Sequence, residues 1–250
     1  PASGRGRPTA VAGGRLMDRP RIALLNAAHK AADTRRNFHR ELDAEIETFH
    51  APSGEVPPDY GYDGFVVTGS AASVYWDEAW IGDLKTWVGE AVRVGLPGLG
   101  VCFGHQLLAD VLGGSVRAMG EYEIGYRTVC QDGDNRLLAG VPDDMTVFTS
   151  HSDHVTEAPP GATVFARNEY GIHGFRTGRV FAVQFHPEYD RSTAEEIAAS
   201  KDDELSAERL QRVRDGITEE NYAAACEAKR LFDNFLAYVA EVRADRLAVD

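Results

Sequence analysis

Short apolar runs alternate with amphipathic stretches along the first part of the chain. An apolar run of about four to eight residues is typical of a buried strand, whereas apolar positions three or four residues apart are typical of a helix that covers a core. Strands are predicted at residues 22–25, 45–49, 64–68 and 99–101, and helices at residues 33–42, 80–94 and 103–112. This alternation predicts an α/β domain.

Residues 115–185 have a different pattern, in which short β segments are separated by turns. Strands are predicted there at residues 126–130, 145–150, 163–166, 172–175 and 180–184. We therefore expect this stretch to form a small β-rich portion of the same domain.

The chain becomes helical after Tyr189. A last long helix is predicted from an apolar stripe at helical spacing, formed by Tyr222, Cys226, Leu231, Phe235 and Val239. The polar run at residues 206–218 is expected to be a solvated cap or connector. A chain of 250 residues is long enough for one substantial core and short for two. We expect a single domain over residues 20–245, which includes the helical segment 190–245 and follows a disordered tail over residues 1–19.

The charge balance narrows the partners that the protein can have. The formal net charge is -13, and phosphate binding needs a basic surface, so nucleic acids and anionic membranes are not expected partners. The chain has no apolar run of about 18 residues and no signal-like apolar stretch at its start, so a cytoplasmic location is expected.

The cysteines and histidines give no sign of a metal site. Cys102, Cys130 and Cys226 lie far apart, are odd in number and form no Cys-x-x-Cys pair, so neither a disulfide framework nor a zinc site is predicted. Two histidines lie in the segment 150–154, but neighbouring histidines on a turn usually bond the backbone or solvent. No metal or other cofactor is predicted.

One cysteine lies in a sequence that suits a nucleophile. Gly100, Cys102 and Gly104 fall between a predicted buried strand and a helix, and small neighbours relieve crowding where a strand turns sharply into a helix. The free N–H groups of the helix N-terminus would stabilise a thiolate at this position. The alternative is that Cys102 is a small core residue, as free cysteines often are.

A histidine and a glutamate follow the last predicted strand. If the strand through Gln184 stays extended, His186 and Glu188 point to the same side, and Pro187 holds the backbone between them. A histidine that moves a proton to and from a thiol needs an acceptor on its second nitrogen, and Glu188 supplies one. The three residues Cys102, His186 and Glu188 are therefore the candidate catalytic group.

Gly-x-Cys-x-Gly-His-Gln at residues 100–106, followed by Gln-Phe-His-Pro-Glu at residues 184–188, resembles the class I (triad) glutamine amidotransferase family, and more narrowly its GMP synthase-like members. The resemblance extends from about Arg21 to Tyr189. It implies a mainly parallel, flavodoxin-like central sheet flanked by helices. It also implies hydrolysis of the glutamine side-chain amide through a glutamyl thioester on Cys102, with His186 protonating the departing ammonia and Glu188 orienting His186.

The same resemblance implies where the oxyanion of the tetrahedral intermediate binds. Family members take one backbone donor from the residue after the nucleophile, here Phe103, and others from a glycine-rich loop that matches residues 68–74. Gly69 fits that loop, whereas Ser70 and Ala71 stand where many relatives have Gly-Pro. Gly69 and Ser70 are therefore candidates whose loop geometry departs from the family pattern.

The resemblance further implies contacts with the amino-acid head of the substrate. Gln106 lies four residues after Cys102, so it shares a helix face with the nucleophile, and family members use this glutamine for the substrate. Ser150, His151 and Ser152 match a family loop that lines the glutamine pocket. The stretch from Glu123 to Tyr126 also matches a recurring segment, for which we derive no chemical role.

Three functions remain open from the sequence. The first is a glutaminase that supplies ammonia to a separate synthase subunit, the second is an autonomous hydrolase of γ-glutamyl peptides or related amides, and the third is a catalytically silent binding relative. The presence of all three candidate catalytic residues disfavours the third. The first is preferred, with glutamine or a γ-glutamyl compound as substrate and a synthase as partner.

Overall fold

The computed structural model describes residues 19–132 and 135–248. Its strands form one nine-stranded sheet. Five neighbouring strands run parallel, in the order β2 (Glu45–His50), β1 (Arg21–Asn26), β3 (Gly64–Val67), β4 (Gly98–Val101) and β9 (Val180–Val183). Four antiparallel strands continue the sheet beyond β9, in the order β8 (Gly171–Thr177), β7 (Thr163–Asn168), β5 (Ser115–Gln131) and β6 (Asp144–Glu157).

The predicted fold class is confirmed, since the central parallel strands are flanked by helices. The β-rich portion is not a separate layer, because β8 pairs with β9 and joins both halves into one mixed sheet. β5 and β6 are longer than the predictions at 126–130 and 145–150. Most residues of β5 are half-buried or exposed, and β6 interrupts its buried residues with half-buried and exposed ones, because the two strands form a ribbon that is partly open to solvent. Long apolar runs therefore do not mark them.

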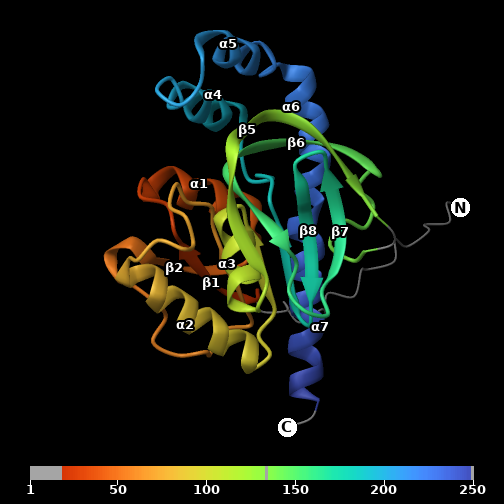
Figure 1. Cartoon of the computed structure of the whole chain (residues 1–250). Coiled ribbons are helices and arrows are strands. Elements are labelled where there is room, and N and C mark those ends of the chain that lie inside the picture. Colours follow the sequence, from red (N-terminus) through yellow and green to blue (C-terminus); the bar gives the residue numbers. More distant parts are fainter. Residues whose placement is uncertain (1–18, 133–134, 249–250) are drawn as a thin grey trace, which may run out of the picture.

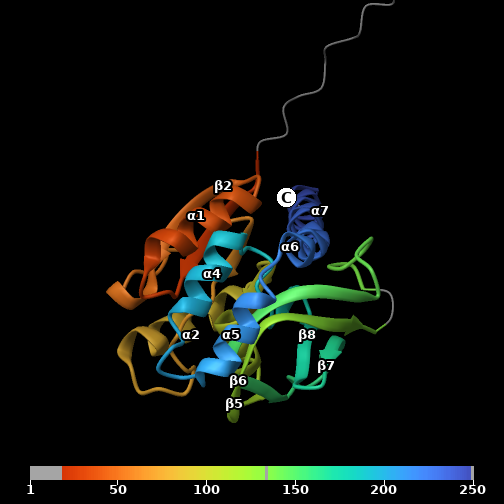
Figure 2. The same cartoon turned by 90° about the horizontal axis from the view of Figure 1, so that it is seen from above.

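Helices cover the parallel half of the sheet on both faces (Figures 1 and 2). α1 (Ala31–Glu41) and α7 (Arg230–Leu247) lie on one face, where Phe38 and Phe235 share a core with Val66 and Val101. α2 (Ala79–Arg93) and α3 (Phe103–Val111) lie on the other, where their apolar side chains pack on the alternate residues of β1 and β3. This alternation follows from the strand geometry, which points successive side chains to opposite faces. A single 3-10 turn, η1 (Ala51–Ser53), follows β2.

The C-terminal segment is helical as predicted, but it is divided into α4 (Arg191–Ala199), α5 (Ala207–Asp215), α6 (Glu219–Ala225), η2 (Cys226–Lys229) and α7. The prediction of one long helix from Tyr222 to Val239 is therefore wrong in its first part. Ala225 and Arg230 keep right-handed helical dihedral angles, so the chain tightens to a 3-10 turn rather than leaving the helical path.

The predicted solvated connector at residues 206–218 is also corrected. It contains α5, whose Leu210 and Val213 are buried against Ile124 and Phe148 in a small separate cluster. In Figure 1, α4 and α5 stand together at the top of the molecule, above β5. Two apolar side chains on a nine-residue helix are enough to dock it, although its average composition is polar.

We propose that residues 20–245 form one domain, because Leu231 and Phe235 of α7 lie in the same apolar core as the central strands. Residues 1–18 of the predicted tail lie outside the described residues, and Arg19 pairs with Asp43 at 2.7 Å. Within residues 19–132 and 135–248, no helix combines the length and the apolar character needed to cross a membrane.

Candidate active site

Cys102 lies in the sharp turn between β4 and α3. Its backbone has φ 53° and ψ -102°, which makes it the single non-glycine residue with positive φ in the part of the chain that the structure describes. Its N–H donates to Val183 O at 2.9 Å, and its carbonyl accepts from Gln106 N at 3.1 Å. The turn is therefore held from both sides. A conformation of this kind costs energy and is typical of functional sites.

The two flanking glycines are required by close packing around this turn. A Cβ on Gly100 would lie 2.4 Å from Gly104 O, and a Cβ on Gly104 would lie 2.3 Å from Val67 O. Both distances are shorter than any real carbon–oxygen contact. The spacing of glycine, cysteine and glycine thus follows from how closely α3 approaches β3 and β4.

His186 and Glu188 lie just after β9. The strand ends at Val183, close to the predicted end at Gln184, and the chain then bends, so the backbone does not stay extended as far as Glu188. The two side chains nevertheless meet, with His186 Nδ1 and Glu188 Oε1 2.8 Å apart. The backbone N–H of His186 donates to Phe148 O at 2.8 Å. This bond fixes the histidine against β6.

The charge state of His186 follows from its neighbours. Burial lowers its pKa, but the charges of Glu188 and Cys102 and hydrogen bonds to both side chains outweigh burial and raise the pKa to about 10. Tyr189 stacks on the imidazole with ring centroids 4.1 Å apart, and burial next to Glu188 raises the pKa of Tyr189. His186 is therefore an imidazolium at neutral pH, in contact with the Cys102 side chain.

The loop after β3 passes directly over this imidazolium. A Cβ on Gly69 would lie 2.8 Å from His186 Cε1 and 3.6 Å from Cys102 Cβ. Thr68 anchors the loop, because its hydroxyl accepts from Ala27 N at 3.0 Å and donates to Gly69 O at 3.1 Å. The hydroxyl of Ser70 accepts from Ala72 N at 3.1 Å, so this side chain closes a local turn.

Gly69→Ala is expected to reduce activity strongly while leaving the rest of the fold intact. The new methyl group would force either the loop or His186 to move, and a displacement of about 1 Å at an active site can cost up to about 100-fold in rate. Steady-state kinetics and thermal unfolding of the variant test this. Gly82→Ala is the matched control, because a Cβ there has no heavy atom within 4 Å. Full activity of Gly69→Ala would contradict the prediction.

The remaining candidate residues differ in burial and in their distance from Cys102. Phe103 is the first residue of α3 and is buried. Gln106 is also buried, and its Nε2 donates to Asp153 O at 2.9 Å and to Gln184 Oε1 at 3.2 Å. The carbonyl oxygen of Ser150 lies 3.9 Å from Cys102 Sγ. Ser152 is exposed.

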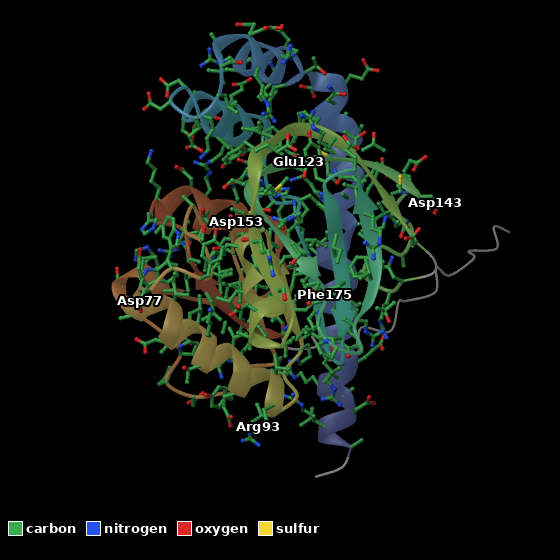
Figure 3. All side chains as sticks on the ribbon, viewed as in Figure 1. Asp77, Arg93, Glu123, Asp143, Asp153 and Phe175 are labelled. Carbon is green, nitrogen blue, oxygen red and sulfur yellow. The ribbon has the colours of Figure 1, made fainter. Side chains whose placement is uncertain are left out.

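The side chain of His151 points into the protein, where both ring nitrogens have partners. Nδ1 lies 2.9 Å from Asp153 O, and Nε2 lies 2.6 Å from Glu123 Oε2. The structure thus brings Gly69, Ser150 and His186 next to Cys102, whereas it places the His151 side chain in an interior network. Figure 3 labels Glu123 on β5 and Asp153 on β6, the two strands that carry this network.

Several residues near the site were not identified from the sequence. Tyr189 stacks on His186, and the Tyr75 hydroxyl donates to Asp153 Oδ1 at 3.0 Å. Glu123 and His173 are fully buried beside His151. A buried glutamate in the segment from Glu123 to Tyr126 could have been suspected from its family resemblance, but its partners depend on strand register.

One group of side chains in the described part of the chain has the composition of a metal site: Glu123, His151 and His173, whose donor atoms lie within 4.8 Å of one another. Glu123 Oε2 and His151 Nε2 are 2.6 Å apart, which is the distance of a direct charge-assisted hydrogen bond. We therefore interpret Glu123 and His151 as a hydrogen-bonded pair, with His173 Nε2 3.2 Å from the same carboxylate oxygen.

Comparison with known proteins places this chain in a family. The model of the family described as "Glutamine amidotransferase class-I" matches residues 29–201. The chain is 32% identical over 169 residues to gamma-glutamyl peptidase 3 of Arabidopsis thaliana, a match that covers 63% of this chain and 68% of that protein. It is 33% identical over 161 residues to the glutamine-hydrolyzing GMP synthase of Campylobacter lari, covering 63% of this chain and 30% of the synthase.

Solved structures of glutamine amidotransferases have a similar fold. A crystal structure of a glutamine amidotransferase from Thermotoga maritima superposes with a TM-score of 0.75 at 24% identity, covering 87% of this chain and 98% of that one. The chain spans about a third of the length of the GMP synthases that it matches. With the family model covering more than half of its residues, the chain belongs to the class I glutamine amidotransferase family.

Proposed function

We propose that this chain is a cysteine-dependent glutaminase that uses Cys102, His186 and Glu188. The observation that carries the proposal is the contact between a strained elbow cysteine and an imidazolium whose other nitrogen bonds Glu188. The Cys102 thiolate attacks the carboxamide carbon of glutamine. His186 then protonates the amide nitrogen, ammonia leaves, and a glutamyl thioester remains.

The same groups support the second half of the reaction. After ammonia has left, His186 is neutral and can take a proton from a water molecule that attacks the thioester carbon. Glutamate is released and the thiolate–imidazolium pair is restored. Glu188 holds the imidazole by Nδ1, so that the opposite nitrogen serves Cys102 in both steps. No cofactor is needed for this cycle.

The oxyanion of each tetrahedral intermediate needs preorganised donors. The N–H of Phe103 at the start of α3 is the first candidate, because it follows the nucleophile directly and belongs to the free N-terminal turn of a helix. The loop from Gly69 is the second, because it lies over His186 and beside Cys102. Ser70 supports this loop through its bond to Ala72 rather than by contact with the substrate.

We propose that the ammonia is used by a synthase on a separate chain. The support is the match to GMP synthases, in which this chain corresponds to about a third of the protein. A soluble complex in the cytoplasm is the expected setting, since Cys102, Cys130 and Cys226 are all unpaired thiols and such thiols persist in a reducing compartment.

The second candidate function is hydrolysis of γ-glutamyl peptides without a partner. It is favoured by the relative from Arabidopsis thaliana, whose name is gamma-glutamyl peptidase 3 and which this chain covers over 68% of its length. Both reactions break the same kind of amide bond, so the candidate catalytic residues serve either.

The test is to incubate the purified protein with glutamine and with a panel of γ-glutamyl dipeptides and to measure glutamate release. Glutamine hydrolysis that rises when a synthase is added supports the first function. Efficient cleavage of a dipeptide by the isolated protein, with glutamine left intact, supports the second. If neither substrate is cleaved in the presence or absence of a synthase, the proposal is wrong.

A further inference from the structure

A buried carboxylate lies in the antiparallel half of the sheet, away from the candidate catalytic residues. Glu123 of β5 is fully buried and has polar neighbours from three other strands or turns. His151 Nε2 lies 2.6 Å from its Oε2, His173 Nε2 lies 3.2 Å from the same oxygen, and Asn168 Nδ2 donates to its Oε1 at 2.6 Å. Burial raises its pKa, but the bonds and charges of the two histidines outweigh burial and bring the pKa to about 2. Glu123 is therefore ionised.

The bonding of His151 determines its charge. Nδ1 faces the carbonyl of Asp153 at 2.9 Å, and Nε2 faces the carboxylate of Glu123. A carbonyl and a carboxylate only accept hydrogen bonds, so both ring nitrogens must carry a proton. A neutral imidazole has a single N–H, so its unprotonated nitrogen would face an oxygen that can only accept a hydrogen bond. The shared proton belongs on the imidazole, because histidine is the stronger base of the two.

The position of this pair in the sheet indicates a role in the register between β5 and β6. The ladder between β5 and β6 is interrupted between Ala118 and Glu123, and it resumes where Glu123 faces His151 directly. Backbone hydrogen bonds do not hold the register across the irregular segment. The ion pair between Glu123 and His151 can hold the register instead. A slip by one residue would place the side chains of one strand on the opposite face of the sheet and separate the pair.

The segment of β6 next to this pair contacts the nucleophile. The carbonyl oxygen of Ser150 lies 3.9 Å from Cys102 Sγ, and the carbonyl of Asp153 accepts from Gln106 Nε2 as well as from His151. His151 thus lies between two carbonyl groups that face the elbow helix. A shift of β6 along β5 would move both carbonyl groups relative to Cys102.

We propose that Glu123 and doubly protonated His151 form a buried ion pair that positions the Ser150–Asp153 segment against Cys102 and Gln106. Glu123 is accordingly a positioning residue for the reaction, and this inference rests on the proposed function. His173 shares the carboxylate as a neutral ring, since burial lowers its pKa. A zinc ion bridging the three side chains is the competing explanation, and it needs the close contact between Glu123 and His151 to open.

The first experiment measures the charge of His151 directly and needs no activity. In protein labelled with ¹⁵N in its histidine rings, NMR is expected to show protons on both nitrogens of His151 at neutral pH. A single-proton tautomer at neutral pH would overturn the proposal. One equivalent of zinc retained after desalting, measured by mass spectrometry, would overturn it as well.

The second experiment uses Glu123→Gln, which keeps an acceptor but removes the counter-charge. His151 is then expected to lose its extra proton and one of its two hydrogen bonds, and kcat/KM is expected to fall by up to about 100-fold. Glu123→Asp should recover part of the loss because it keeps the charge. Glu157→Gln, at the exposed end of β6, is the matched control and should behave like wild type.

A pH profile separates positioning from general destabilisation. The titratable groups that face His151 are Glu123 from β5, His173 from β8 and His105 from α3. Asp153 on β6 faces it with its backbone carbonyl, while its carboxylate accepts from the Tyr75 hydroxyl. In Glu123→Gln, acid restores the second proton of His151, so the ratio of variant to wild-type activity should rise as the pH falls. A constant ratio, or a variant as active as wild type, would contradict the proposal. If wild type lacks activity on every substrate, the proposed function fails, whereas the NMR result still decides the ion pair.

Discussion

Replacing Cys102 with alanine or serine is expected to abolish hydrolysis of glutamine and of γ-glutamyl peptides. No other cysteine can substitute, since Cys130 and Cys226 lie on β5 and η2, away from the elbow. Loss of a covalent nucleophile typically lowers kcat by a factor on the order of a million. Glutamate release, measured against a blank without enzyme, is the readout.

The same site can be identified by chemical labelling. A glutamine analogue that carries an electrophile at the position of the amide should modify wild type at Cys102 alone, as judged by peptide mass spectrometry. Cys130 is exposed, but the carboxylate of Asp144 raises the pKa of its thiol and makes it a poor nucleophile. Labelling concentrated on Cys130 or Cys226 would show that the nucleophile has been assigned wrongly.

Glu188→Gln is expected to lower kcat by about 100- to 10,000-fold, because the amide no longer holds His186 as an imidazolium with the correct nitrogen toward Cys102. In wild type the raised pKa of His186, about 10, keeps the imidazolium present throughout the neutral range and loses it only as the pH approaches 10. Removing the negative charge of Glu188 lowers that pKa. The thiolate of Cys102 then loses its counter-ion at a lower pH.

The measurement is the rate of Cys102 alkylation by iodoacetamide between pH 6 and pH 9. Wild type should react readily at pH 6 to 7, whereas Glu188→Gln should react slowly there and regain speed only at alkaline pH. Glu195→Gln removes an exposed carboxylate that pairs with Arg191 and serves as the control. Identical profiles for wild type and Glu188→Gln would show that Glu188 has no part in the charge state of the site.

Local patterns were sufficient to predict the parallel half of the sheet and the approximate position of the elbow. The β4 strand and the α3 helix were predicted to within about two residues. Glycines on either side of Cys102 indicated a close approach, and the distances from Gly100 and Gly104 explain why. That Cys102 and His186 meet was expected from their chemistry and from the family resemblance of the two motifs. In the structure, β4 and β9 are parallel neighbours that end at the same edge of the sheet.

What could not be predicted depends on register and on contacts that are distant in sequence. Glu123 and His151 are partners only because β5 and β6 resume their ladder at this pair, after an irregularity that no local pattern marks. His173 joins them from β8, a strand that pairs with neither. The polar composition of residues 206–218 led to the prediction of a solvated segment. The structure instead has the helix α5 there, because Leu210 and Val213 are buried against Ile124.

The pairing of β4 with β9 has a consequence for the time course of folding. Gly98 and Val180 are partners although about 80 residues separate them, and closing so long a loop is entropically costly and slow. β9 lies between β4 and β8 in the sheet, and His186 follows β9 directly. Cys102 of a newly made chain therefore has no histidine beside it until this long-range pairing has formed.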